Sequence, residues 1–285
     1  MKEFFKLLKR GTRTAKFGMV IIVLWLLCAI FAPLIAPEGE NDVDIMQRMT
    51  PPCWAEGGSM EHIFGTDEVG RDILSRIIYG TRVSLIVGLG STIISFFIGT
   101  LLGLLSGYFG GKVDTVIMRI VDVMLAFPFI FLALCMMAVL GSSLTNVIIV
   151  LGITGWVPYT RTVRAQVLSV REREYVTATN ITGARRFYVM VKHILPNVID
   201  SAIILGTLEM GNAILSEASL TFLGMGVPPS IATWGSMIAS GRNYIFIAYW
   251  LTTIPGIAIF LVCLSINFVG DWIRDVRDPR LRNAD

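Results

Sequence analysis

Two carboxylates stand in an otherwise apolar stretch late in the chain. Glu209 and Glu217 lie in the segment from about Val198 to Gly224 and are separated by about 80° around an α-helix. A carboxylate in lipid is costly, so such a group is expected to face the interior of a helix bundle or a water-filled cavity. One hypothesis places Glu209, Asn212 and Glu217 on the wall of a translocation path. The alternative buries both glutamates in hydrogen bonds between helices, with Asn212 and Ser216 as local partners.

No other set of residues predicts an active site. The nearest approach to a phosphate-binding loop is SGYFGGKVD, but Ser106 stands where that motif needs a glycine and Val113 where it needs Ser or Thr. His62 and His193 fall on opposite sides of the membrane in the topology derived below, and no metal-binding cluster surrounds either. We therefore expect no catalytic residue, no metal site and no nucleotide site in this chain. Energy for transport would come from an ion gradient or from another subunit.

The composition predicts that these residues belong to an integral membrane protein. The chain has 285 residues, of which 54% are hydrophobic and 16% charged, whereas soluble domains carry about 25% charged residues. A bilayer core needs about 20 apolar residues per helix, so the charge-poor runs predict six transmembrane helices in an all-α fold. Their expected bounds are about 17–36, 84–107, 116–140, 144–165, 198–223 and 247–270. We expect the first to remain as an uncleaved helix.

The placement of charge orients these helices. Residues 1–16 hold six basic residues and one acid, which places the N-terminus in the cytoplasm because Lys and Arg mark that side. The loop 37–82 has nine acids against four bases and is expected outside, whereas 161–197 has seven bases against two acids and is expected inside. With six spans the C-terminal tail also ends in the cytoplasm.

Two further patterns concern the packing of the helices. Gly99, Gly103 and Gly107 recur at four-residue spacing, which predicts a ridge of small residues where another helix approaches closely. Pro128 and Pro255 are expected to kink the helices that contain them.

The segment between the fourth and fifth spans predicts a bent pair of short cytoplasmic helices. Gly183 interrupts the helical pattern and Pro196 is expected to end it. Arg185 and Lys192 fall on the polar face of the second helix. Its apolar face is expected to consist of Phe187, Val191, Ile194 and Leu195. Periodicity alone allows this face to rest on lipid headgroups or to contact a partner protein.

The same segment resembles a known motif. Ala178, Gly183, Leu195 and Pro196 match the spacing of the "EAA" loop of ATP-driven importer permeases, in which a Glu-Ala-Ala triplet precedes a Gly and an Ile-x-Leu-Pro ending. The departures from that pattern are Thr177, Thr179 and His193. Four other blocks, in order between Phe64 and Arg282, are similar to the C-type permease of dipeptide, oligopeptide and nickel importers. They begin FGTDEVGRD, GYFGGKVD, ILSEASLTFLG and NFVGDWIRD.

The resemblance implies a type I ABC importer permease (MetI-like) fold with six transmembrane helices and cytoplasmic termini. Residues 1–83 would hold the cytoplasmic N-terminus, the first helix and an extracytoplasmic loop. Residues 84–270 would form the permease core, including a cytoplasmic coupling loop at about 166–197, and 271–285 the cytoplasmic tail. The implied location is the bacterial or archaeal plasma membrane.

The resemblance also implies partners. They are a second, homologous permease subunit in a heterodimer, two ATP-binding subunits that hold the ATP and Mg, an extracytoplasmic solute-binding protein and membrane lipid, with no nucleic acid. The acidic loop and Val227–Arg242 would face the binding protein. Residues implied to seat the coupling loop on an ATPase are Ala178, Gly183, Ala184, Arg185, Arg186, Leu195 and Pro196.

The implied cargo is a dipeptide or oligopeptide. The same machine could instead carry a nickel chelate, glutathione or another small solute, because similar permeases serve several solutes. A stand-alone secondary transporter or channel is a distant third hypothesis.

Overall fold

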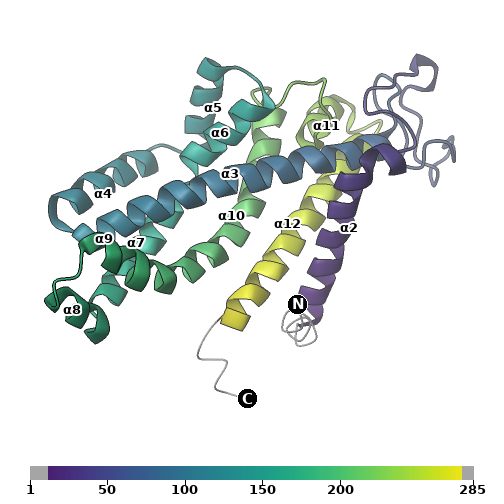
Figure 1. Ribbon diagram of the computed structural model, residues 1–285. Helices are drawn as coiled ribbons and strands as arrows, with labels where there is room; N and C mark the ends of the chain where they lie inside the picture. The colour runs from purple at the N-terminus through teal and green to yellow at the C-terminus, as the bar shows by residue number, and fades with distance from the viewer. Residues whose placement is uncertain (1–11, 278–285) are drawn as a thin grey trace.

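The computed structural model describes residues 12–277, and its regular structure there is helical apart from one isolated bridge between Thr66 and Asp72 (Figure 1). Four helices are long: α2 (Arg13–Ile35), α3 (Ile73–Phe109), α10 (Leu195–Phe222) and α12 (Trp250–Arg277). The shorter ones are α4 (Gly111–Ala126), α5 (Phe129–Leu140), α6 (Leu144–Thr154), α7 (Val157–Arg171), α8 (Glu174–Ile181), α9 (Arg186–Val189) and α11 (Trp234–Gly241). Two 3₁₀ turns, Ile45–Gln47 and Arg242–Tyr244, and one π turn, Met190–Ile194, complete the set.

The all-α prediction is confirmed, but the six spans are not. Within residues 12–277, four helices are long and apolar enough to cross a membrane, or five if α4 and α5 form one bent span. The predicted fourth span, 144–165, is divided into α6 and α7 around Gly155. Pro158 lies in the first turn of α7, where a missing N–H costs nothing, so it favours a helix start there.

The long helix α3 connects the two ends of the molecule. Its 37 residues span about 55 Å at 1.5 Å per residue, well beyond a bilayer core. The loop 36–72 lies at its first turn, where Asp72 caps the helix by accepting a hydrogen bond from the Ser75 N–H (2.7 Å). Helices α8 and α9 lie near its opposite end (Figure 1). Helix α3 therefore extends from the predicted extracytoplasmic loop to the predicted coupling loop.

The glycine ridge on α3 is confirmed as a close helix contact. A Cβ atom added at Gly99 would lie 2.4 Å from the Cβ of Tyr159, and one added at Gly103 would lie 2.7 Å from the carbonyl oxygen of Thr160. At Gly107 it would meet Val167 at 2.7 Å. Three successive turns of α3 thus contact the backbone and Cβ atoms of α7 directly.

The kink at Pro128 is also confirmed. The axes of α4 and α5 differ by 90° across Phe127 and Pro128, where Phe127 is extended. The residue before a proline is disfavoured in the α conformation, which explains why α4 ends there. Pro255 lies inside α12, which continues as a helix from Trp250 to Arg277.

The loop 36–72 is held together by its own acidic side chains. Asp67 accepts hydrogen bonds from the backbone N–H of Val69 (3.0 Å) and from Arg71 Nε (2.6 Å). Buried His62 lies 3.1 Å from the carboxylate of Asp72 and 3.8 Å from that of Glu38. Partial burial raises the pKa of the Glu38 carboxyl, because removal from water disfavours its charged form. The loop is therefore a folded unit rather than a flexible connection.

An ion pair fastens α4 to α7 near the end of α3. Arg164 on α7 donates from Nε and Nη2 to the two carboxylate oxygens of Asp114 on α4, at 2.6 and 2.7 Å. The Ser106 hydroxyl on α3 donates to the same carboxylate at 2.5 Å. The planar guanidinium matches a carboxylate with two parallel hydrogen bonds, which a lysine ammonium cannot do.

Replacing Arg164 with lysine is expected to destabilise the protein by about 1–2 kcal/mol, because the charge is kept while the two-pronged hydrogen bond is lost. Thermal unfolding of the purified protein in detergent measures the effect. Arg161→Lys, at an exposed position of α7, serves as the control and is expected to leave the midpoint unchanged. Equal midpoints for both variants would contradict a stabilising role for the pair.

Candidate functional site

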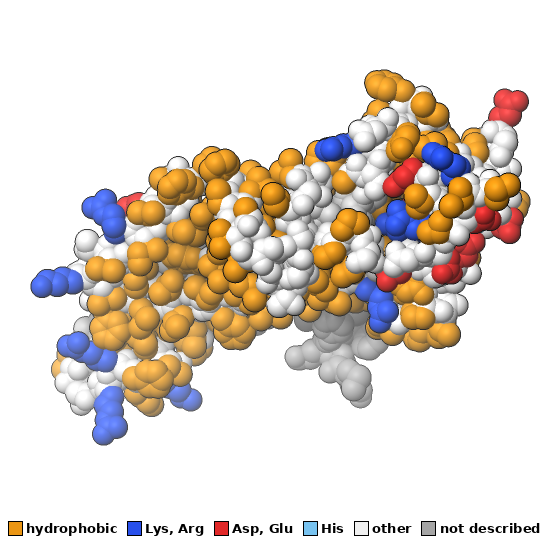
Figure 2. Space-filling model, turned by 90° about the horizontal axis from the view of Figure 1, so that it is seen from above, with side chains coloured by type: hydrophobic (Ala, Val, Ile, Leu, Met, Phe, Trp, Pro, Cys, Tyr) orange, Lys and Arg blue, Asp and Glu red, His pale blue; other side chains and the backbone are white. Residues whose placement is uncertain are grey.

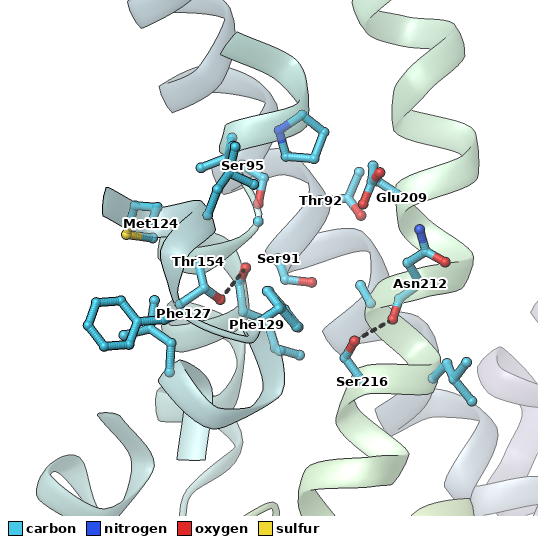
Figure 3. A pocket seen from close by; sticks show the side chains of 18 residues that line it. Ser91, Thr92, Ser95, Met124, Phe127, Phe129, Thr154, Glu209, Asn212 and Ser216 are labelled. Atoms are coloured by element: carbon cyan, nitrogen blue, oxygen red, sulfur yellow. Dashed lines mark hydrogen bonds between the residues drawn. The ribbon is translucent and has the colours of Figure 1, made fainter. Parts of the chain in front are cut away.

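A cavity of about 450 Å³ opens between α10 and the helices α3 to α7. Its polar lining comes from three helices (Figure 3). These residues are Ser91, Thr92 and Ser95 on α3, Thr154 on α6, and Glu209, Asn212 and Ser216 on α10. The remaining lining is mainly apolar and includes Met124, Leu125, Phe127, Phe129 and Leu132 around the bend between α4 and α5.

Most hydroxyl groups of this lining are satisfied by helix carbonyls. Ser91 donates to the carbonyl oxygen of Val87 (2.6 Å), and Ser95 donates across to that of Gly152 (2.8 Å). Thr92 is different, because its buried hydroxyl has no hydrogen-bond partner. A buried polar group without a partner is uncommon and invites a functional explanation.

Glu209 and Asn212 line this cavity, and their place on a translocation path stays a prediction. They project from successive turns of α10 toward the cavity, followed by Ser216, whose hydroxyl donates to the Asn212 carbonyl (2.7 Å; Figure 3). The carboxylate of Glu209 is partly exposed to this space and forms no ion pair with the part of the chain that the structure describes. None of the side chains that line the cavity belongs to Lys, Arg or His.

Glu217 does not line the cavity. Its side chain is fully buried, and one carboxylate oxygen accepts a hydrogen bond from the Thr221 hydroxyl (2.9 Å). This part of α10 packs against α11, since a Cβ added at Gly235 would lie 2.7 Å from the Cα of Ala218. A separation of 80° is enough to turn one glutamate toward the cavity and the other toward α11. Glu217 is buried in the bundle, as the alternative expected, but its hydrogen bond lies within α10 and joins Thr221 rather than Asn212 or Ser216. Within residues 12–277 its second carboxylate oxygen has no hydrogen-bond partner.

Sequence reasoning missed the wall that faces Glu209. Thr92 on α3 and Tyr159 on α7 are both buried, and neither hydroxyl has a hydrogen-bond partner. Both approach α10 near Gly206, where an added Cβ would lie 3.5 Å from the Tyr159 hydroxyl and 3.9 Å from the Thr92 methyl group. The signal that could have identified Thr92 is the run of hydroxyl residues along the second predicted span.

The predicted coupling loop forms an exposed structure around Gly183. The bend expected at this glycine is confirmed, with φ of +79° between α8 and α9. Ala178, Arg185 and Arg186 are exposed, and Ala184 is partly buried. An added Cβ at Gly183 would meet nothing within 4 Å, so the space around it is open in this chain.

One detail predicted for this loop is wrong. The helix does not end at Pro196, because Arg186 to Phe222 form one helical run through the π turn. The widened turn avoids the clash of the proline ring with the preceding carbonyl, and the Asn197 side chain donates to the carbonyl oxygen of His193 (2.7 Å). Of the predicted apolar face, Ile194 is buried against α7 together with Val189 and Met190. Phe187 is 73% exposed, and its contact with lipid or a partner stays a prediction.

Charge differs between the two ends of the molecule. In Figure 2 the acidic side chains visible on this face gather mainly at the end that carries the loop 36–72, while Lys and Arg dominate the opposite end. Between them the visible surface is largely hydrophobic or uncharged, as expected of a segment in lipid. Within residues 12–277 no group of three or more His, Cys, Asp or Glu could hold a metal ion.

Two family models match the chain. Residues 99–283 match the binding-protein-dependent transport system inner membrane component, and residues 2–52 match the N-terminal transmembrane domain of oligopeptide transport permease C.

Similar proteins span the whole chain. The di/tripeptide transport system permease protein DppC of Pseudomonas aeruginosa is 42% identical over 100% of this chain and 93% of its own length. The probable D,D-dipeptide transport system permease protein DdpC of Escherichia coli is 42% identical over 95% and 89%. The oligopeptide transport system permease protein OppC of Bacillus subtilis is 37% identical over 96% and 88%.

Solved structures share the fold. Two crystal forms of an inward-facing MetNI methionine ABC transporter match with TM-scores of 0.58 and 0.60, at 20% and 19% identity. The matches cover 71% and 72% of this chain and 97% and 98% of the matched chains.

Proposed function

The chain belongs to the family of binding-protein-dependent transport system inner membrane components, and from this membership we propose that it forms one half of the pore of an ATP-driven peptide importer. It is a multi-pass permease subunit, and its relatives are permease subunits rather than the catalytic parts of their transporters. The second half of the pore would be a homologous permease. Two further subunits would bind ATP and Mg, and an extracytoplasmic binding protein would deliver the solute.

The observation that carries the proposal is the polar cavity on α10. Its lining joins one carboxylate and several hydroxyl groups to an apolar wall, inside a chain otherwise built for lipid. A path for small peptides needs such a mixed surface, because their backbone groups require hydrogen bonds while their side chains vary. Glu209 and Asn212 would form part of this path. Glu217, buried against α11, would hold the bundle together.

The coupling segment would transmit the ATPase cycle to the cavity. The exposed residues around Gly183 offer a knob that a partner could enclose, and the buried Val189, Met190 and Ile194 fix this knob on α7. The helical run from Arg186 to Phe222 then connects the knob to Glu209 without a break in the chain. Movement of the knob would therefore displace one wall of the cavity.

Di- and oligopeptides are the cargo that we favour, because the named relatives belong to dipeptide, tripeptide and oligopeptide systems. The alternative cargoes are a nickel chelate, glutathione or another small solute carried by the same kind of machine. A permease working without ATPase subunits is the remaining alternative.

Purification of the tagged chain from its own membrane tests the assembly. A second permease, two ATPase subunits and ATP-dependent uptake into proteoliposomes are expected. Isolation of this chain alone, with uptake driven by a proton gradient, would overturn the proposal. Identification of the neighbouring genes and of the solute retained by their binding protein would separate peptides from metal chelates.

A further inference from the structure

Glu209 is a carboxylate without a cationic partner in its cavity. It shares this cavity with Thr92, whose hydroxyl lacks a hydrogen-bond partner in the described part of the chain. Among residues 12–277 Glu209 forms no ion pair, and the other side chains lining its cavity are neutral. Asn212, one turn along α10, is its neighbour on the same helix. A negative charge within a largely apolar protein wall is costly unless a positive charge compensates it. The chain itself supplies no such charge in this lining.

Two hydroxyl groups near this part of α10 lack hydrogen-bond partners within residues 12–277. Thr92 lines the cavity, is 91% buried and has no hydrogen-bond partner among the described residues. In Figure 3 its side chain and that of Glu209 lie on the facing walls formed by α3 and α10. The Tyr159 hydroxyl, fully buried and also without a partner, approaches the same turn of α10 at Gly206. Thr92 therefore offers an unused hydroxyl to the same cavity as Glu209, while the Tyr159 hydroxyl lies behind this wall.

A primary ammonium group is the ligand that fits these acceptors. It carries a positive charge and three N–H donors, and it accepts no hydrogen bond. A carboxylate neutralises the charge, while hydroxyl oxygens can accept the remaining donors. An anion would be repelled by Glu209, and a neutral ligand would leave the charge of Glu209 uncompensated.

We propose that Glu209, with Thr92, forms a site in the cavity wall for the primary ammonium group of a passing solute. This proposal rests on the proposed transport function and specifies its chemistry. In a peptide the group is the free N-terminus or a lysine side chain. The site would hold the charged end of the solute while the apolar wall around Phe127 and Phe129 accommodates the rest.

The electrostatic effect of Glu209 on the cavity can be measured by labelling a cysteine with charged reagents, without requiring transport. The complex is purified with this chain's Cys28, Cys53, Cys135 and Cys263 replaced by serine and with Ser216→Cys as a reporter, two helical turns from Glu209. Its rates of reaction with positively charged, negatively charged and neutral methanethiosulfonates are compared. We expect the ratio of cation to anion rates to fall about tenfold or more on Glu209→Gln. Glu217→Gln, the same change on the same helix outside the cavity, should leave the ratio unaltered.

Protection of the reporter tests the ligand. Alanyl-alanine at millimolar concentration is expected to slow labelling, whereas N-acetyl-alanyl-alanine should have no effect, and Glu209→Gln should abolish the difference. Nα-acetyl-lysine amide carries an ammonium group only on its side chain. Protection by this compound therefore shows whether the site accepts a lysine ammonium as well as an N-terminus.

Three outcomes would overturn the site: equal protection by both dipeptides, a rate ratio independent of Glu209, or a reporter that no reagent reaches. None of these depends on uptake. Loss of ATP-driven uptake in the parent complex, with selective protection retained, would instead contradict the transport function and leave the ammonium site standing.

Discussion

Replacement of Gly183 by leucine is expected to leave the protein in the membrane and assembled but to reduce ATP-driven uptake to background. The residue has φ of +79°, a conformation that costs an L-residue about 1–2 kcal/mol. Nothing in this chain lies within 4 Å of the added Cβ, so the fold itself loses little else. If a partner subunit encloses the knob, the leucine side chain would occupy space that the partner needs. Uptake into proteoliposomes and ATP hydrolysis, measured on the same preparation, check the result.

The control for this variant is Gly141→Leu. Gly141 has φ of +83° in the turn between α5 and α6, and an added Cβ there also meets nothing within 4 Å. Leucine there is also strained, since φ is positive and ψ is 163°, but the position lies outside the predicted coupling segment, so this variant should retain uptake. Normal uptake by Gly183→Leu, or equal loss in both variants, would contradict the assignment of the coupling segment.

The second large effect is expected from the smallest change on the glycine ridge, Gly103→Ala. The new methyl group would lie 2.7 Å from the carbonyl oxygen of Thr160 and 2.8 Å from the Cβ of Val163. Backbone cannot move aside as a side-chain tip can, so α3 and α7 must separate along the ridge, and overpacking of this kind costs about 1–3 kcal/mol or more. A lower midpoint of thermal unfolding and less assembled complex in the membrane are the measurable results.

Gly256→Ala is expected to change the stability of the protein in the opposite direction. Gly256 lies in α12, where an added Cβ meets nothing within 4 Å. Alanine favours a helix over glycine by about 1 kcal/mol, so this variant should be neutral or slightly more stable. A destabilised Gly256→Ala together with an unaffected Gly103→Ala would show that helix propensity, not packing, governs these positions.

The sequence predicts best the features that depend on local chemistry. The close approach at Gly103, the bend at Gly183 and the break before Phe129 each follow from the steric properties of one residue type, and each is confirmed. The cavity position of Glu209 and Asn212 follows from the cost of a carboxylate in lipid.

Features that depend on which helices meet could not be predicted. Nothing local to Glu217 indicates that α11 folds back against it, and nothing in Tyr159 indicates that its hydroxyl approaches Gly206. The helix through Pro196 was missed for a related reason. A proline normally ends a helix, and here the π turn before it lets the helix continue.

That π turn accommodates one residue more than an α-helical turn would hold, because its hydrogen bonds close over five residues rather than four. Deleting one residue from Met190–Ile194 is therefore expected to restore a regular α-helix with little change in the direction of Glu209. Deleting one residue from the regular part of α10 before Glu209 would shorten the run by about 1.5 Å and rotate the carboxylate by about 100° relative to Gly183, out of the cavity. The number of residues between Gly183 and Glu209 can thus change at the π turn more readily than within α10.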